Sequence, residues 1–137
     1  MSSRAFAIAA LIAVLLALPM PAGAKEGVVA RVLTPISREA APGSMVKVSW
    51  TLTFLEDGKR RPFGGGYVFA RLVGPGGKRT PLAYGVGTRQ PGRYWARVRV
   101  PRGGVGRLEI GIMGSACDAK GCRSAPKLFP LVGRVFR

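Results

Sequence analysis

The sequence predicts an all-β fold, an immunoglobulin-like antiparallel β-sandwich of about seven strands. Two observations carry this prediction. Apolar and polar residues alternate with a period of two along several segments, as they do in half-buried strands. Turn signals rich in glycine and proline separate these segments, and no segment beyond the first 24 residues has a convincing 3.6-residue period. Short strands spaced at roughly 8–12 residues are typical of a sandwich, with a small barrel as the alternative.

Four segments show the strand pattern most clearly. In the first of them, valine, tryptophan, leucine and phenylalanine alternate with lysine, serine and threonine, and Trp50 stands near the middle of the apolar face. The second is apolar on both faces except at Arg71, which predicts a central strand. The four segments are 45–55, 67–73, 94–100 and 108–112.

Weaker strand patterns and turns complete the domain. The weaker strands are 28–33, a short one around 82–86, and 128–136, which Pro130 and Gly133 interrupt. The predicted turns are 41–44, 56–58, 74–77, 90–92 and 101–104. The residues expected to fill the core are Trp50, Phe54, Phe69, Tyr94, Val98 and Ile110.

Residues 1–24 have the features of a secretory signal peptide. Arg4 precedes an uncharged run at 5–18, and the small residues at 22–24 predict cleavage before Lys25. The alternative is a membrane anchor, but a spanning helix needs about 20 apolar residues and this run has 14. We therefore expect export, with the protein secreted or associated with the cell envelope.

The composition of the chain argues against catalysis and metal binding. The 137 residues include 22 Lys and Arg against 6 Asp and Glu, a formal charge of +16, and no histidine. Without histidine the commonest general base and metal ligand is missing, and two cysteines cannot build a four-ligand zinc site. We expect residues 25–137 to form one domain that is not an enzyme and holds no metal or cofactor.

The two cysteines, Cys117 and Cys122, bracket a four-residue turn after a predicted strand. An exported chain with an even, small number of cysteines normally pairs them. The alternative, a redox or metal pair, is disfavoured because the redox motif has two intervening residues rather than four. We therefore expect a disulfide that staples one hairpin, worth about 2 kcal/mol in the chain-entropy model.

The basic residues gather in one strand and two loops. An arginine-rich stripe with one aromatic residue lies on a single face of the strand at 94–100, and further cations lie near 60 and near 78. Such a charge attracts polyanions, and an aromatic between arginines can stack on a base or a sugar. The alternative is a solvated surface that keeps the protein from aggregating. The candidate anion-binding residues are Arg93, Trp95, Arg97, Arg99, Arg60, Arg61, Lys78 and Arg79.

The stretch Pro-Gly-Arg-Tyr-Trp-Ala-Arg-Val-Arg-Val-Pro-Arg-Gly-Gly at 91–104, continued by 106–114, resembles a run found in small exported bacterial sandwich domains. These are the YtkA-like, FixH-like and CopC-like immunoglobulin-fold proteins, and Trp50 and the loop at 61–64 are consistent with the resemblance. The resemblance implies the fold and export. Copper-handling members bind metal through histidines, which this chain lacks, so it implies no copper site here.

The sequence thus predicts a non-catalytic binding or accessory domain outside the cell membrane. In one hypothesis the basic stripe binds an anionic envelope polymer, an anionic lipid or extracellular nucleic acid. In the other, a protein partner adds a strand to an exposed sheet edge and the charge is only a solvated surface. Sensitivity to salt separates the two, because polyanion binding weakens as ionic strength rises.

Overall fold

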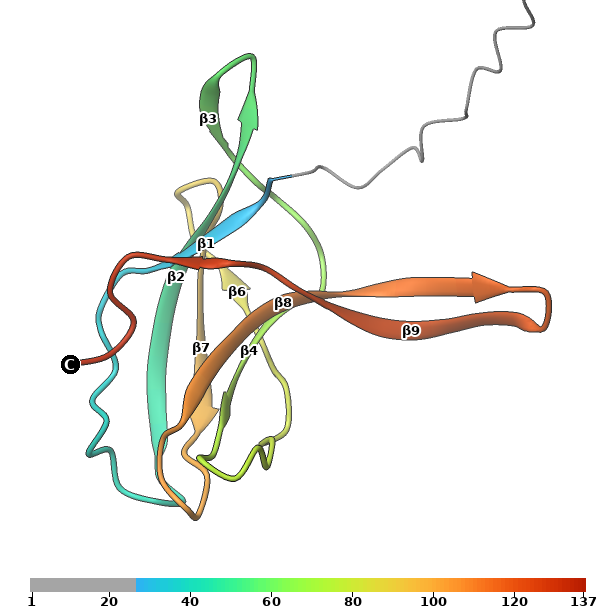
Figure 1. Ribbon diagram of the computed structural model, residues 1–137. Coiled ribbons are helices and arrows are strands. Elements are labelled where there is room, and N and C mark those ends of the chain that lie inside the picture. Colours follow the sequence, from blue (N-terminus) through green and yellow to red (C-terminus); the bar gives the residue numbers. More distant parts are fainter. Residues whose placement is uncertain (1–26) are drawn as a thin grey trace, which may run out of the picture.

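The computed structural model describes residues 27–137, so the predicted signal peptide at 1–24 lies outside the described residues. The described chain forms two β-sheets and contains no helix (Figure 1). The strands are β1 (Val29–Val32), β2 (Met45–Glu56), β3 (Lys59–Pro62), β4 (Val68–Val73), β5 (Ala83–Tyr84), β6 (Val86–Gly87), β7 (Arg93–Arg99), β8 (Arg107–Asp118), β9 (Gly121–Leu128) and β10 (Leu131–Val132).

The two sheets have different sizes. The larger has six strands, in the order β10-β1-β2-β7-β6, with β3 pairing to the far end of β2. The smaller has four, in the order β5-β4-β8-β9. All pairs are antiparallel except β1 with β10. The all-β prediction is confirmed, and β4 is central in its sheet, as its apolar faces predict.

Both sheets contribute side chains to one hydrophobic core. Trp50 of β2 and Val98 of β7 come from the larger sheet, and Leu72 of β4 and Ile110 of β8 from the smaller; all four are fully buried. The Trp50 ring stacks on that of Tyr94, with 6.0 Å between the ring centroids. The alternation along β2 and β7 thus places the apolar side chains of each strand against the other sheet.

The six residues predicted for the core are all buried, but one of them faces the other way. Phe69 is fully buried, yet its neighbours Val68 and Ala70 on β4 face the shared core, so Phe69 lies on the outer face of the smaller sheet. Its cover there includes the guanidinium of Arg71, 5.7 Å from the ring centroid. Gly111, opposite Phe69 on β8, leaves room for the ring.

Two weaker strand predictions need correction. The segment 82–86 contributes to two short strands in different sheets, and the chain crosses between them at Gly85, where an added Cβ would lie 2.9 Å from the Trp50 ring. The weak strand predicted over 128–136 is reduced to the two-residue β10, between the interrupting Pro130 and Gly133, and an isolated bridge from Phe136 to Ile36. With 82–86 divided in two and β3 and β9 added, the described strands number ten rather than about seven.

The strand predicted at 67–73 begins one residue later than expected. Tyr67 has a φ of 60°, a left-handed conformation that a bulky residue rarely adopts and that is incompatible with a strand. The sequence contains no signal for this conformation, because the run from Tyr67 into Val68 is apolar and aromatic.

The ends of β8 and β9 form an arm that projects well beyond the two sheets (Figure 1). The predicted disulfide is confirmed: Cys117 and Cys122 lie opposite each other near the tip and are bonded. Most side chains of the arm are exposed, so little apolar burial holds its strands together. A two-stranded ribbon is marginally stable in water. The disulfide therefore stabilises the part of the fold that has least packing.

We expect Gly111→Ala to destabilise the domain and Gly114→Ala, on the same strand, to leave it intact. A methyl group at Gly111 would collide with the carbonyl oxygen of Lys127 and lie 2.8 Å from the Phe69 ring. At Gly114 the nearest atom is 3.8 Å away. Overpacking of this kind costs about 1–3 kcal/mol, whereas an unhindered Gly→Ala change in a strand gains up to about 1 kcal/mol. Urea denaturation of both variants measures the difference, and equal stabilities would contradict the packing described for Phe69.

We expect reduction of the disulfide to loosen the arm more than the two-sheet body. Amide hydrogen exchange should accelerate at 114–127, while amides of β2 and β7 in the body stay protected. The measurement is exchange by mass spectrometry with and without a reductant, using Cys117→Ser/Cys122→Ser as the second sample. Uniform acceleration across the chain would instead mean that the arm and the body unfold as one unit.

Candidate anion-binding site

The predicted arginine stripe lies on the outer face of the six-stranded sheet. Arg93, Trp95, Arg97 and Arg99 alternate along β7 with the buried residues of the core, so all four side chains point away from the other sheet. Arg97 and Arg99 are exposed, and Arg93 and Trp95 are half-buried. Antiparallel pairing then sets what lies beside them on the neighbouring strands.

Neighbouring strands bring further cations to this face. Lys47 on β2 lies opposite Arg97, and its Nζ is 4.9 Å from the centre of the Trp95 ring. Arg31 on β1 lies two strands from β7, beside Thr51. Lys47 and Arg31 are not among the predicted anion-binding residues, although both stand at outward positions of predicted strands. The alternation of each strand indicates that Lys47 and Arg31 point outward. Only the pairing register of the strands places these two residues next to the stripe.

The loop cluster predicted at Arg60 and Arg61 is strand β3, and its two arginines lie on opposite faces. Arg60 Nη1 donates a hydrogen bond to Thr53 Oγ1 at 3.4 Å and so belongs to the outer face. Arg61 pairs with Glu56, Nε to Oε2 at 3.5 Å, and both are solvent-exposed. Only Arg60 therefore joins the stripe.

We define the basic face as the outward cations of the six-stranded sheet with the side chains between them. It comprises Arg31, Lys47, Arg60, Arg93, Arg97 and Arg99, together with Ser49, Thr51, Thr53 and Trp95. The only carboxylate in any strand of this sheet is Glu56, which is held by Arg61 on the other side of the hairpin. None of the ion pairs found among residues 27–137 involves a cation of the basic face.

Two shallow hollows indent the basic face. One, of about 240 Å³, lies between β2, β7 and the loop at 88–90, and its cations are Lys47, Arg89 and Arg93. The other, of about 250 Å³, contains Arg31 and Arg60 with the hydroxyls of two threonines. The face is thus cationic in its depressions as well as on its ridges.

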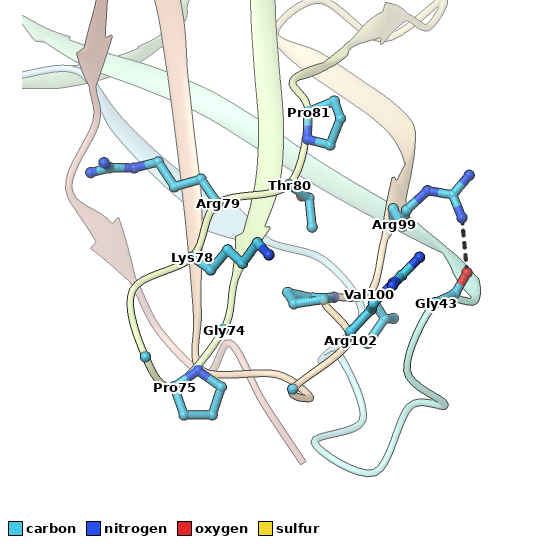
Figure 2. A pocket seen from close by; sticks show the side chains of 13 residues that line it. Gly43, Gly74, Pro75, Lys78, Arg79, Thr80, Pro81, Arg99, Val100 and Arg102 are labelled. Carbon is cyan, nitrogen blue, oxygen red and sulfur yellow. Dashed lines mark hydrogen bonds between the residues drawn. The ribbon is translucent and has the colours of Figure 1, made fainter.

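Lys78 and Arg79 lie elsewhere, on the loop after β4 at the end of the two sheets. Figure 2 shows Lys78 pointing into the space between this loop and the loop that follows β7, whereas Arg79 points away from it. Arg99 lines the same space, and its Nη1 donates to the Gly43 carbonyl at 3.0 Å. Arg99 therefore lies at the junction of the basic face and this groove.

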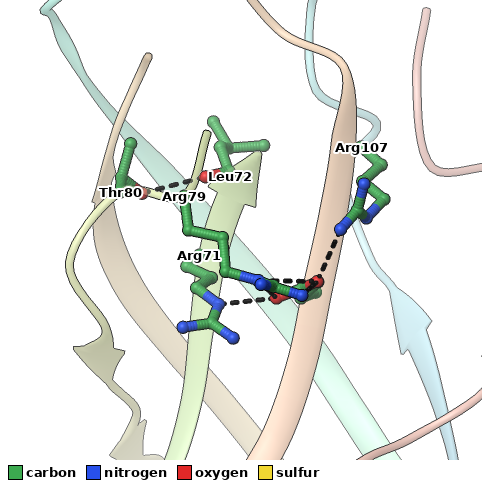
Figure 3. A network of polar contacts seen from close by, with 6 residues as sticks. Arg71, Leu72, Arg79, Thr80 and Arg107 are labelled. Carbon is green, nitrogen blue, oxygen red and sulfur yellow. Dashed lines mark hydrogen bonds and ion pairs between the residues drawn. The ribbon is translucent and has the colours of Figure 1, made fainter. Parts of the chain in front are cut away.

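Arg79 belongs to a network around the buried Glu109. Its side chain and those of Arg71 and Arg107 converge on one carboxylate group (Figure 3), and the Glu109 side chain is only 4% exposed. The nitrogen–oxygen distances are 2.5 Å from Arg71, 3.1 Å from Arg107 and 3.4 Å from Arg79. Burial by itself raises the pKa of Glu109, but the hydrogen bonds from the three arginines and the charge of Arg71 outweigh it and lower the pKa.

The described residues contain neither a metal-type cluster nor a membrane-spanning helix. No three His, Cys, Asp or Glu side chains gather within residues 27–137 in a way that would hold an ion. That part of the chain also has no helix with the length and apolar character needed to cross a membrane.

Comparison with known proteins gives no relative: the chain matches no protein-family model, and no curated protein is significantly similar to it.

We expect Glu109→Gln to destabilise the domain by on the order of 3 kcal/mol, because it leaves the half-buried Arg71 without its counter-charge. In the unsubstituted protein the lowered pKa of Glu109 contributes stability that is fully present above the unfolded-state pKa. That stability is lost as the pH falls through the lower, folded-state pKa, below about pH 4. Denaturant unfolding at pH 7 and between pH 4 and 2 measures both effects.

The matched control is Glu56→Gln, which breaks the exposed pair with Arg61 and should change stability by less than about 1 kcal/mol. If Glu109→Gln retained the full stability and acid sensitivity of the unsubstituted protein, the network would have no part in holding the smaller sheet.

Proposed function

We propose that this chain is an exported, non-catalytic binding domain of immunoglobulin-like type that holds an anionic polymer on the basic face. The observation that carries the proposal is the charge distribution. Six cations share one sheet face with Trp95, without a carboxylate among them and without an ion pair among the described residues. If the charge served only to keep the protein in solution, carboxylates could be mixed with the cations on this face. Their absence from the face favours a role in binding an anion.

The dimensions of the basic face suit an extended chain rather than a single ion. Alternate residues of one strand lie about 6.6 Å apart, so Arg93 to Arg99 span roughly 20 Å. Arg31 and Lys47 widen this row across two neighbouring strands, each about 4.8 Å from the next. Successive charges of a polymer can therefore meet successive cations, and each contact adds to affinity and to its dependence on salt.

Trp95 and the hydroxyls supply contacts that charge alone does not. The Trp95 ring lies under Lys47 and beside Arg93 and Arg97, where it can pack against a sugar ring or a base. Ser49, directly opposite Trp95, can donate to or accept from an uncharged oxygen of the polymer. These contacts favour a polymer with anionic groups on a ring-containing backbone.

The alternative is that a protein partner adds a strand to a sheet edge. The edge strands of the two sheets are short or interrupted, which disfavours this alternative. The edge strands β5, β6 and β10 have two residues each, and β3, which pairs only with β2, has four. The longest edge strand is β9, in which Pro126 lies opposite Met113 of β8. The Met113 N–H donates to the Tyr67 carbonyl, on the side away from β9. Met113 and Pro126 are therefore a non-hydrogen-bonded pair, and the backbone polar groups of Pro126 point to the open edge of the sheet. Proline has no N–H to offer there, and it interrupts the edge. Such edges resist pairing with another chain.

We expect Lys47→Ser/Arg97→Ser to weaken binding of the purified protein to heparin, a sulfated polysaccharide, at least 10-fold at low salt. The slope of log affinity against log salt concentration should become shallower by about 2, because each lost cation removes roughly one unit. Affinity measured across a salt titration tests this.

The matched control is Lys120→Ser/Arg123→Ser, which removes the same charge from the projecting arm. It should keep the slope and most of the affinity. Equal weakening in both double variants would mean that net charge alone drives binding, and binding indifferent to salt would favour the sheet-edge alternative. Either result would overturn the proposal for the basic face.

A further inference from the structure

The groove beside Lys78 has a character different from the basic face. It lies where the two sheets end, between the loop at 74–81 that follows β4 and the residues Arg99–Gly103 at the end of β7, with Gly43 at its margin (Figure 2). Its volume is about 640 Å³, within the range of roughly 300–1,000 Å³ that small-molecule sites occupy. This is more space than a phosphate or carboxylate group alone would fill.

The walls of the groove are mostly apolar and contain no aromatic ring. Pro75 and Pro81 are exposed and line it from the loop after β4, and Pro101 lines it from the β7 side, where the fully buried Val100 belongs to the core beneath. The Thr80 hydroxyl is already bonded to the Leu72 carbonyl at 3.0 Å. Since tryptophan and tyrosine are absent from the lining, the groove offers no stacking surface for a sugar ring or a base. Its interior suits aliphatic carbon.

The polar groups of the groove are cationic and lie at its rim. Lys78 and Arg102 are exposed and take part in none of the ion pairs of residues 27–137, and Arg99 is positioned by its bond to the Gly43 carbonyl. No carboxylate lines the groove. Arg79 also contributes to the lining, but its guanidinium is directed to Glu109.

From this combination we infer a second ligand site, which adjoins the basic face at Arg99 and binds a monomeric aliphatic anion. The hydrocarbon part lies along the three prolines, and a phosphate or carboxylate head is held by Lys78 and Arg102 at the rim. Burial of methylene groups supplies affinity, and the cations select for a charged head.

The test is titration of the purified protein with dodecyl phosphate below its micelle concentration, followed by amide chemical shifts. We expect saturable shifts at Gly43, 74–81 and 99–103, with inorganic phosphate and the uncharged dodecyl maltoside each binding at least 10-fold more weakly. Dodecanoate should bind comparably to dodecyl phosphate, because the two share the chain and the anionic head.

Two variants test the cationic rim and the apolar lining of the groove separately. Lys78→Ser/Arg102→Ser removes the rim cations and should weaken dodecyl phosphate binding at least 10-fold. Gly103→Phe keeps the charge but adds a bulky ring at the lining, and its first side-chain atom is accommodated because nothing lies within 4 Å of a Cβ added there. It should also abolish binding. The matched control is Gly64→Phe, a glycine with equal free space outside the groove, which should bind normally.

Several results would overturn the inference. Equal affinity for inorganic phosphate would mean that the apolar lining is unused, and equal affinity for dodecyl maltoside would mean that the cations are unused. Unchanged binding by Gly103→Phe would place the ligand elsewhere. Binding to anionic-lipid vesicles but not to the monomer would point to a membrane-surface contact instead. The proposals for the groove and for the basic face can be tested independently. Lys47→Ser/Arg97→Ser should keep dodecyl phosphate binding, and Lys78→Ser/Arg102→Ser should keep most heparin binding.

Discussion

The pairing of β2 with β7 is the constraint on which both the core and the basic face depend. The same register that stacks Trp50 on Tyr94 inside the domain sets Lys47 opposite Arg97 on the outside. A slip of one residue in either strand would turn its core side chains outward and its cations inward. The burial of Trp50 and its neighbours therefore also holds the cations in position, and the basic face needs no contacts of its own to be ordered.

The carboxylates of the described strands are placed so that they do not neutralise this face. Glu109 is buried on the outer side of the smaller sheet among three arginines, and Glu56 is held by Arg61 at the end of the β2–β3 hairpin. The cations near them are thereby used within the protein. Those of the basic face and the groove rim remain available to an external anion, which is why these two regions carry the functional proposals.

The sequence predicted the central part of the candidate site but grouped it with residues that the fold separates. The alternation along β7 was enough to place Arg93, Trp95, Arg97 and Arg99 on one exposed face. Proximity in the chain could not reveal that Arg61 turns to Glu56, or that Arg79 reaches across to Glu109. Those partners lie on other strands or at other register positions, and only strand pairing brings them within reach.

Local chemistry by itself determined the strands with clear alternation, the turns and the disulfide of the hairpin, because period-two burial, glycine–proline turns and paired cysteines act over a few residues. The tertiary structure alone decided that Phe69 faces outward over Gly111, that Lys47 and Arg31 join the stripe, and that the loops after β4 and β7 enclose a groove. Each of these depends on which strand lies beside which, and long-range pairing leaves no local trace in the sequence.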